Sequence, residues 1–356
     1  MRKRPAKIKF AYSSHLPELF SRLSDGAKLA RWLGVRTCDL DWLCNPIRSD
    51  QLLNENASRH YVCRWVRKRS TGWRLIESPK PMLKECQRKI LAEILNHVPA
   101  HPLACGFCKS KSIVDFVKPH VHRSVCLKMD LADFFPTITV GRVVGLFRAI
   151  GFKRAIAHQL ALLSTTHTDS CLLGEGPITQ PARRESQIAI LHKRHLAQGA
   201  PTSPVIANLC AYRLDLRLSG LARKIGSVHY TRYADDLLFS GNQRFGRQAK
   251  WLQVLVGQIA IEEGFQINFR KTRIMHAHDR QKAGGVVLNS RLNLDRRDFD
   301  RLKATLNNCV RHGVESQNRD GHPNFRQHLQ GKINWVRTLN PGKADRLEKL
   351  FQQIKF

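Results

Sequence analysis

The sequence is poor in acidic residues and has no long apolar run. It contains 28 Asp and Glu residues against 60 Lys and Arg residues, a formal net charge of +32 over 356 residues. Such an excess of one sign indicates a polyanionic partner, most simply a nucleic acid. A membrane surface is the other candidate, but no apolar run is long enough to span a bilayer. We therefore expect a nucleic-acid partner and no membrane.

A signal peptide and a cysteine framework are also missing. Residues 1–9 are basic and lack the apolar core of a signal peptide, so they predict a basic arm. The 10 cysteines are scattered without a regular framework, which favours a reducing, cytoplasmic location. A hydrophobic content of 42% is normal for a folded chain, and we find no internal repeat.

The chain changes character along its length, and 356 residues suffice for two domains or lobes. We predict a basic helical region over residues 1–58, mixed strands and helices over 59–290, and a basic helical lobe over 291–356. Within the middle region, Gly, Pro and mixed charge over 166–197 predict an irregular loop or insertion.

Residues 229–241 read as strand, tight turn and strand, with Asp235 and Asp236 at the tip. Adjacent carboxylates repel each other, and a divalent cation relieves the repulsion. Oxygen ligands of this kind suit Mg²⁺, which binds one or two carboxylates together with substrate phosphates. The alternative is an ordinary acidic turn, because Asp is a common turn residue.

A second acid and a small-residue loop precede this hairpin. Residues 125–130 alternate between apolar and other side chains, which predicts a half-buried strand that ends at Asp130. Residues 198–204 form a loop of small residues before a long helix that we expect to run from Ser203 to Gly226. A helix N-terminus favours an anion, although an ordinary capped helix explains the same pattern.

A cationic hairpin comes earlier in the chain. Strand-like residues 61–66 and 73–76 flank a turn, with Arg67, Lys68, Arg69 and Arg74 at or near its tip. A solvated charged edge is the alternative reading. Carboxylates that hold two metal ions, together with basic groups on a triphosphate, are what phosphoryl transfer requires.

These stretches, in this order, resemble the motifs of reverse transcriptases over nearly the whole chain from about residue 30. The matching stretches are the Trp73–Arg74, Pro79, Leu83–Lys84 and Gln87–Arg88 finger motifs, then Gly106–Phe107, residues 127–136, residues 198–204 with Asn208, residues 233–236, residues 264–272 and the Gly284 turn. The resemblance implies an α+β fold of the right-hand polymerase type. That fold has fingers, a palm with an antiparallel sheet packed on helices, and a C-terminal helical thumb.

Within that family, residues 198–204 and the compact length look most like bacterial retron reverse transcriptases, which are related to group II intron enzymes. Retron enzymes often carry Asn-Ala-x-x-His before the first acidic motif, and here residues 116–120 keep only His120. They often carry Val-Thr-Gly after the fourth motif, where this chain has Ala-Gly-Gly at 283–285. A different bacterial defence reverse transcriptase is the alternative.

The resemblance also implies roles for individual residues. Asp130 and Asp235 ligate two Mg²⁺ ions, for which Mn²⁺ can substitute, and Asp236 supports or joins them. The remaining candidates would contact nucleotide or nucleic acid: Phe135 as a steric gate against the ribose 2′-OH, Arg74 with Arg67 or Lys68 on the triphosphate, Gln198 in the nucleotide site, Lys271 beside the pyrophosphate, and Lys332 and Arg337 on duplex phosphates.

The implied partners are dNTPs, a structured non-coding RNA that is template and primer, and its DNA product, together with an effector protein from the same operon. Retron enzymes prime from the 2′-OH of an internal guanosine and leave a branched RNA–DNA product, usually in anti-phage defence. Two other readings compete. One is a polymerase with another template or priming mode, and the other is a non-catalytic RNA-binding scaffold, against which the intact acids argue.

Overall fold

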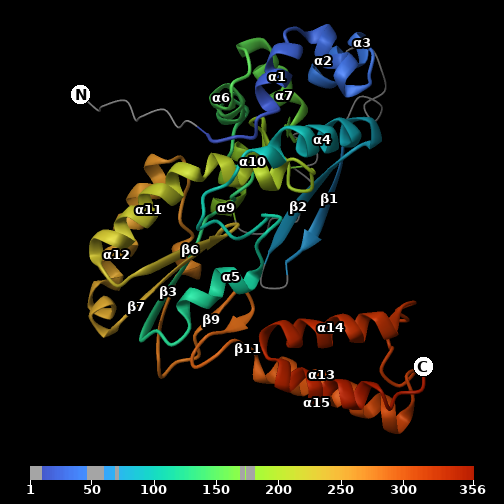
Figure 1. Cartoon of the computed structure of the whole chain (residues 1–356), viewed down its shortest axis with the longest axis vertical. Helices are drawn as coiled ribbons and strands as arrows, with labels where there is room; N and C mark the ends of the chain where they lie inside the picture. The colour runs from blue at the N-terminus through green and yellow to red at the C-terminus, as the bar shows by residue number, and fades with distance from the viewer. Residues whose placement is uncertain (1–9, 46–59, 69–71, 169–172, 174–180) are drawn as a thin grey trace. The chain divides into compact units, whose positions relative to one another are not determined.

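The computed structural model describes residues 10–45, 60–68, 72–168, 173 and 181–356 (Figure 1). Arg69 of the cationic hairpin and much of the predicted 1–58 region therefore lie outside the described residues. The chain divides into two compact units, which are described separately below. The first comprises Met1–Cys108, Leu131–Leu218 and Val256–Ile267, and the second comprises Lys109–Asp130, Ser219–Leu255 and Asn268–Phe356.

The first unit is mainly helical, with two antiparallel pairs of strands. Its helices are α1 (Leu16–Arg22), α2 (Gly26–Leu33), α3 (Thr37–Cys44), α4 (Pro81–Glu93), η2 (Leu95–His97), α6 (Val140–Ile150), α7 (Arg154–Leu163), α9 (Pro181–Leu191) and α10 (Ser203–Cys210). Its strand pairs are β1 (Tyr61–Arg67) with β2 (Trp73–Pro79), and β4 (Thr165–Thr166) with β5 (His195–Leu196). Two helices run from one unit into the other, α11 (Tyr212–Ile225) and α12 (Gln243–Glu262).

The second unit contains a four-stranded antiparallel sheet in the order β6-β7-β3-β8 and a three-stranded sheet in the order β11-β10-β9. The strands are β3 (Val125–Asp130), β6 (His229–Tyr233), β7 (Asp236–Gly241), β8 (Arg273–His276), β9 (Lys282–Ala283), β10 (Val286–Val287) and β11 (Asn293–Leu294). The helices are α5 (Ile113–Val117), η3 (Lys118–His120), η4 (Phe269–Lys271), α13 (Arg296–His312), α14 (Phe325–Leu339) and α15 (Pro341–Phe351).

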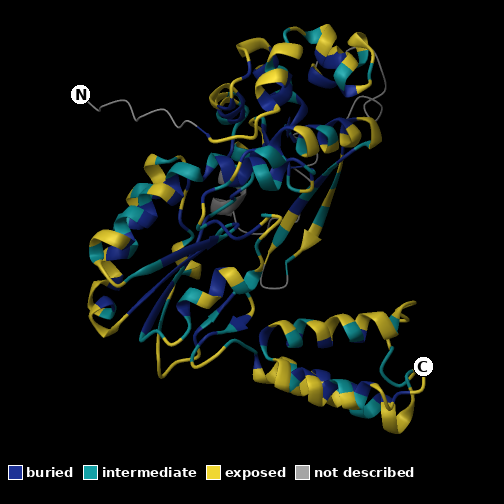
Figure 2. Cartoon of the chain, viewed as in Figure 1, coloured by how far each residue is buried: buried dark blue, intermediate teal, exposed yellow. Residues whose placement is uncertain are grey.

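The two central strands of the larger sheet are buried almost throughout (Figure 2). Strand β3 begins and ends where the sequence predicts, but it is not half-buried. Cys126 is fully buried on the face where we expected polar or exposed side chains, and Lys128 alone in this strand is partly exposed. Burial on both faces explains why apolar residues fill β3 and β7 instead of alternating.

The C-terminal helices have a hydrophobic core of their own. Leu302 and Leu306 of α13 pack with Leu329 and Ile333 of α14 and with Leu347 of α15. The core agrees with the predicted basic helical lobe, and the mixture of helices and antiparallel sheets confirms the predicted α+β class. The boundaries at residues 58 and 290 stay predictions. No helix in the described part of the chain is both long and apolar enough to cross a membrane.

Three local predictions are wrong. The expected helix over 203–226 is broken at Ala211, which separates α10 from α11. Residues 181–191, expected to be irregular, form α9. Residues 265–269, which we expected to form a strand, make only a single bridge, between Ile267 and Leu131. The strand that pairs with the outer side of β3 is β8 instead.

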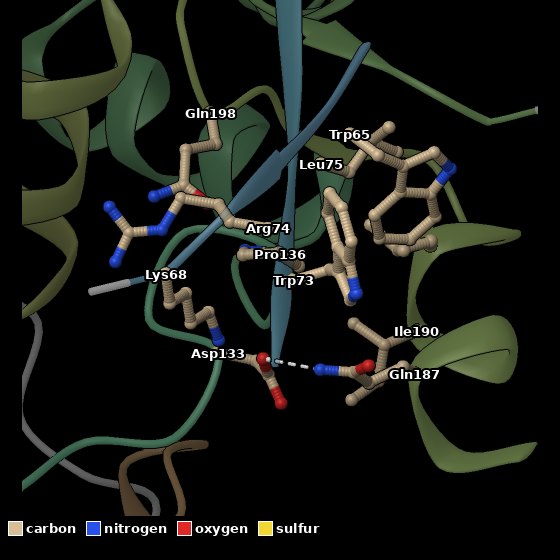
Figure 3. Close-up of a pocket in the computed structure, with 11 residues that line it drawn as sticks. Trp65, Lys68, Trp73, Arg74, Leu75, Asp133, Pro136, Gln187, Ile190 and Gln198 are labelled. Carbon is tan, nitrogen blue, oxygen red and sulfur yellow. Dashed lines mark hydrogen bonds between the residues drawn. The ribbon is translucent and has the colours of Figure 1, made fainter. Parts of the chain in front are cut away.

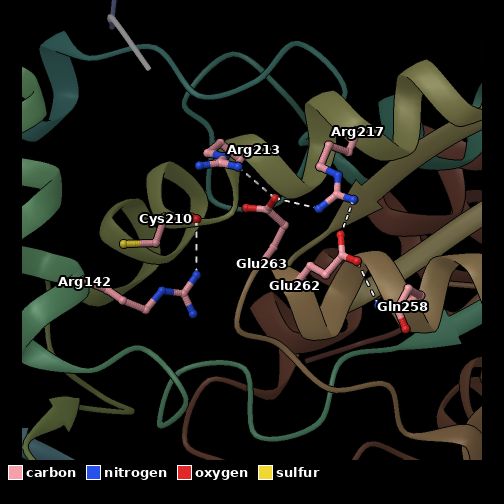
Figure 4. Close-up of polar contacts among 7 residues, drawn as sticks. All are labelled: Arg142, Cys210, Arg213, Arg217, Gln258, Glu262 and Glu263. Atoms are coloured by element: carbon pink, nitrogen blue, oxygen red, sulfur yellow. Dashed lines mark hydrogen bonds and ion pairs between the residues drawn. The ribbon is translucent and has the colours of Figure 1, made fainter. Parts of the chain in front are cut away.

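The break at Ala211 coincides with side-chain bonds to the ends of two helices. Arg142 donates to the carbonyl oxygens of Cys210, at 3.4 Å, and Gly264, at 2.9 Å, which lie at or just beyond the ends of α10 and α12. A helix end leaves such carbonyls without partners, so the guanidinium satisfies both. Figure 4 shows the neighbouring ion pairs, in which Arg213 and Arg217 of α11 reach Glu263 after α12. These contacts all lie within the first unit.

Candidate active site

The antiparallel pairing of β3 with β7 brings two predicted acids together. Asp130 is the last residue of β3 and pairs directly with Asp236, the first residue of β7. Side chains directly opposite each other in such a pair lie about 4.5–5.5 Å apart at Cβ, where like charges are destabilising. Asp235 immediately precedes Asp236 in the turn between β6 and β7. Residues separated by more than 100 positions in the sequence therefore form one acidic cluster.

The backbone of the turn is strongly constrained. Ala234 adopts a left-handed conformation with φ of 55°, which is unusual for a residue with a side chain. The fully buried side chain of Arg232 donates to the carbonyl oxygen of Ala234 at 3.0 Å. This bond ties the turn to its own strand β6, so that Asp235 follows a backbone that is fixed from within the sheet.

Two lysines are paired with the acids. The ammonium nitrogen of Lys128 lies 3.0 Å from Oδ1 of Asp236, and that of Lys271 lies 3.0 Å from Oδ2 of Asp130. The Lys271 side chain is 54% exposed whereas that of Asp130 is 8% exposed, so the lysine reaches in from solvent. Each pair partly offsets the repulsion between the carboxylates.

The electrostatic environment favours a bound cation at Asp235. Burial, and then the charges of Asp130 and Asp236, raise the pKa of Asp235 to about 6. Burial also raises the pKa of Asp236, although Lys128 counteracts this. A carboxyl group that is both buried and close to like charges is destabilised when ionised, and a nearby cation reverses that effect.

These carboxylates suit a magnesium ion by their chemistry. Three oxygen donors on a rigid strand end and turn match the ligands that Mg²⁺ prefers. As the side chains stand in the described residues, however, no group of three or more His, Cys, Asp or Glu is arranged to hold a metal. The carboxylates of Asp236 and Asp130 instead each contact an ammonium group, that of Lys128 and that of Lys271.

The predicted triphosphate residues Lys68 and Arg74 line a pocket in the first unit together with Gln198 (Figure 3). In Figure 3 their polar groups lie on one side of the pocket, and the indoles of Trp65 and Trp73 lie on the other. Arg67 is exposed at the end of β1, opposite Trp73, and is not among the lining residues described for this pocket.

The pocket also contains polar residues that sequence analysis did not assign to it. Asp133 precedes no helix and has a positive φ of 44°. Its carboxylate accepts a hydrogen bond from Gln187 of α9 at 3.4 Å, and both residues line the pocket. No pattern in residues 166–197 had indicated that this segment contributes to a binding surface.

A buried polar group joins β2 to the loop that carries Gln198. The backbone N–H of Glu77 donates to the carbonyl of Gln198 at 3.0 Å, while its carboxylate accepts from Thr168 at 2.8 Å and contacts His195 at 3.0 Å. Gly199 follows with φ of +138°, and a Cβ there would lie 2.9 Å from the carbonyl oxygen of Glu77. The glycine therefore permits close approach of the loop to β2.

The adjacent residues Phe134 and Phe135 differ in how far their rings are exposed to solvent. Phe134 is buried, at 3% exposure, and stacks on Phe265 with 5.7 Å between ring centroids. Phe135 is half-buried and lies 6.1 Å from the exposed ring of Phe107. A core role thus fits Phe134, and the ring of Phe135 is partly accessible. The gate role of Phe135 stays a prediction.

The remaining candidates lie on α14. Lys332 is exposed. Arg337 is bonded to Glu348 of α15 at 2.8 Å and to Asn334 at 3.1 Å. To contact a phosphate, Arg337 must exchange those partners, so its predicted role is less direct than that of Lys332.

The contact between Lys128 and Asp236 was missed, although the sequence contains a signal for it. Lys128 precedes Asp130 by two positions in the same strand, so both side chains lie on one face. A cation on that face would have been the natural partner of an acid on the neighbouring strand. Lys271, in contrast, was expected beside the pyrophosphate, and its pairing with Asp130 was not predicted.

Comparison with known proteins identifies the family. The family model described as reverse transcriptase (RNA-dependent DNA polymerase) matches residues 66–312. The chain is 40% identical over 293 residues to the retron Mx65 reverse transcriptase of Myxococcus xanthus, covering 82% of this chain and 64% of that protein. It is 32% identical over 275 residues to the retron Ec86 reverse transcriptase of Escherichia coli, covering 77% of this chain and 74% of that protein.

Among solved structures, telomerase from Candida albicans in complex with a TWJ fragment of telomeric RNA matches with a TM-score of 0.43 at 10% identity, over 78% of this chain and 54% of that one. The family match and the identities to the two retron proteins show that the chain belongs to the reverse transcriptases, RNA-dependent DNA polymerases, and within them to the retron enzymes. The chain spans about two thirds of the length of the Mx65 protein, 64%.

The raised pKa of Asp235 predicts a pH-dependent gain in stability for Asp235→Asn in metal-free protein. A raised pKa means that the folded state binds the proton more tightly than the unfolded state. Ionised Asp235 therefore destabilises the fold above about pH 6, and this destabilisation disappears as the pH falls from there toward 3.8, the ordinary pKa of an aspartate. We expect the substitution to raise the free energy of unfolding by on the order of 1 kcal/mol at high pH.

Urea unfolding in EDTA at several pH values checks this expectation. The gain should be present above pH 6 and shrink in acid, and Asp320→Asn, at an exposed carboxylate in a turn, is the control. A gain that is independent of pH, or a loss of stability at high pH, would contradict the described environment of Asp235.

Proposed function

We propose that this chain is an RNA-directed DNA polymerase that copies part of a structured non-coding RNA into DNA. The observation that carries the proposal is the pairing of Asp130 with Asp236, beside Asp235, at the end of a buried antiparallel sheet. Membership of the reverse transcriptase family and the net charge of +32 support the same conclusion. Like charges at such close range are difficult to explain by stability alone.

In this proposal, Asp130 and Asp235 hold two Mg²⁺ ions, for which Mn²⁺ can substitute, and Asp236 supports them while it is paired with Lys128. When bound, the ions activate the primer hydroxyl and neutralise charge on the triphosphate and the leaving pyrophosphate. Lys271 then has a second role. Its exposed ammonium can leave Asp130 and contact the pyrophosphate, because its long side chain is fixed only at the pair.

The pocket residues would hold the nucleotide. Arg74 and Lys68 supply positive charge for the triphosphate, with Arg67 as an exposed cation on the same hairpin, and Gln198 supplies an amide. Phe135 would crowd a ribose 2′-OH and so select dNTPs. Asp133 in the same pocket is acidic, and it accepts a hydrogen bond from Gln187.

The RNA would bind through its backbone. Lys332 and its neighbours on the basic helical lobe are expected to contact phosphates rather than bases, since cations on a helix surface read no sequence. From the resemblance to retron enzymes, we also propose a retron-type product primed from a 2′-OH, a cytoplasmic location, and an operon-encoded effector in anti-phage defence. A group II intron-like or defence polymerase with other priming is the second candidate.

The most direct functional variant is Asp235→Asn. We expect DNA synthesis on an RNA template to fall by more than about 100-fold, since even the partners of metal ligands contribute 10–100-fold. RNA binding, measured by filter retention in the same buffer, should not change, because the contacts to RNA are made elsewhere. A variant with full polymerase activity would refute the assignment, and loss of RNA binding would point to misfolding.

The gate role of Phe135 predicts a change in sugar selectivity. Phe135→Ala should raise the ratio of ribonucleotide to deoxyribonucleotide incorporation by about 10-fold or more, the discrimination that one steric contact supplies. Single-nucleotide extension with dNTP or rNTP measures the ratio. Phe269→Ala, at a phenylalanine that is 57% exposed, is the control. An unchanged ratio in Phe135→Ala would mean that another residue excludes the 2′-OH.

The retron part of the proposal is tested through the nucleic acid bound in cells. Protein purified from its native host should carry an RNA–DNA product, and sequencing should map the RNA next to the gene for this chain. Treatment with a 2′,5′-debranching enzyme should separate the DNA from the RNA. Bound DNA without a 2′,5′ branch would favour the second candidate, and absence of any DNA would favour a binding role alone.

A further inference from the structure

His120 is a fully buried histidine that the proposed function does not use. It ends η3, directly after α5, and both elements belong to the second unit with the larger sheet. Its Nδ1 lies 2.6 Å from Oγ of Ser240 on β7, and its Nε2 lies 2.8 Å from Oγ1 of Thr231 on β6. One imidazole therefore bridges both strands of the hairpin that carries Asp235 and Asp236.

Counting protons determines how the imidazole is bonded. The hydroxyl of Thr231 has a single proton, which it donates to the carbonyl oxygen of Phe116 at 2.7 Å. It can therefore only accept from His120, so Nε2 carries the ring proton. Nδ1 is then an acceptor, and the hydroxyl of Ser240 donates to it. Three hydrogen bonds, from Ser240 to Nδ1, from Nε2 to Thr231 and from Thr231 to the carbonyl of Phe116, therefore form one continuous chain through a neutral ring.

The surroundings keep the ring neutral. Burial, and then the nearby charges of His229 and Arg123, lower the pKa of His120 to about 3. Protonation would turn Nδ1 into a donor and break the bond from Ser240. The bridge is thus a fixed structural link at physiological pH and not a proton-transfer group.

The bridge acts on the face of the hairpin that carries Asp236. Thr231 pairs with Leu238, Tyr233 with Asp236, and His229 with Ser240, so these side chains share one face of the sheet. On the same face, the ring of Phe116 from α5 lies 5.7 Å from that of Tyr233. Segment α5–η3 therefore contacts the hairpin near its tip through Phe116 and near its base through His120.

We propose that His120 is a positioning residue that fixes the spacing and twist of the two strands and thereby places Asp235 and Asp236 against Asp130. This inference rests on the proposed function, in which those acids bind metal. Since His120 is fully buried, its contribution comes through the hairpin and not through contact with nucleic acid. Positioning of this kind alters metal affinity, because displaced ligands bind less well even when the protein stays folded.

The neighbouring glycine explains how this segment fits. A Cβ on Gly284 would lie 2.5 Å from Cδ1 of Ile113 and 3.5 Å from Cδ1 of Phe116, both on α5. The two places where this chain departs from the retron pattern, residues 116–120 and 283–285, are thus in contact. The missing side chain at Gly284 leaves room for the bulky residues of α5, and the histidine is retained between them and the sheet.

The test measures Mn²⁺ binding by electron paramagnetic resonance on purified full-length protein, without nucleotide or activity assay. Thr231→Val removes the hydroxyl with little change in shape, and Thr231→Ser keeps it. We expect Thr231→Val to weaken Mn²⁺ binding by about 10–100-fold, the usual effect of losing a group that orients metal ligands. Thr231→Ser should restore wild-type binding. Ser164→Ala removes a buried hydroxyl bonded to a helix carbonyl in the first unit and should bind as wild type.

The outcomes separate this inference from the proposed function. If wild-type protein binds Mn²⁺ and Asp235→Asn does not, the metal site stands. Folded Thr231→Val with wild-type affinity then overturns the positioning role alone. If wild-type protein binds no Mn²⁺, the metal site and the inference fail together. Should Thr231→Val not fold, His120→Phe, which keeps a buried ring but removes both ring nitrogens, is measured in its place with the same expected loss.

Discussion

Electrostatic repulsion among three carboxylates is the constraint on which this structure depends. The register of β3 against β7 places Asp130 opposite Asp236, and the turn adds Asp235. A chain with a net charge of +32 could have kept its few acids apart. It instead gathers three of them at one strand end, where burial, and then repulsion from Asp130 and Asp236, raise the pKa of Asp235. The bond from the buried Arg232 and the contacts of the α5–η3 segment lie on the hairpin that carries two of these acids.

Two paired lysines offset part of the negative charge of the acidic cluster. Lys128 belongs to the same strand as Asp130, so its pair with Asp236 is built into the sheet. Lys271 lies outside the sheet and is mostly exposed, so its pair with Asp130 can be exchanged. Asp236 is therefore paired with a lysine of the sheet itself. The charges of Asp130 and Asp235 remain available to a ligand. This difference agrees with the separate roles proposed for Asp236 and for Asp130 with Asp235.

Much of this could be predicted from the sequence, and the exceptions have physical causes. Strand β3 and the cationic hairpin were expected within a few residues of their observed bounds, because their periodicity and turn signals are local. Helix α9 was missed, since glycines, prolines and mixed charge masked it. The break at Ala211 coincides with a bond from Arg142 to Cys210, 68 positions apart in the sequence, and no local pattern records such a contact.

The acids themselves were found because their motif is short and local, whereas their supports were not. His120 was noticed only as the retained residue of a partly lost motif, and its partners Thr231 and Ser240 lie more than 100 positions later. Glu77 and His195 are likewise joined only by the fold. Sequence patterns therefore indicated which residues carry the chemistry, and the tertiary structure was needed to show which residues hold them in place.

The central claim is that the three acids form a divalent-metal site. Anomalous diffraction from a crystal of this protein grown with Mn²⁺ tests it most directly. The account predicts an anomalous peak within bonding distance of carboxylate oxygens of Asp130 and Asp235, with the ammonium of Lys271 displaced from Asp130. A well-ordered site that shows no anomalous peak and keeps the pair of Lys271 with Asp130 at saturating Mn²⁺ would contradict it.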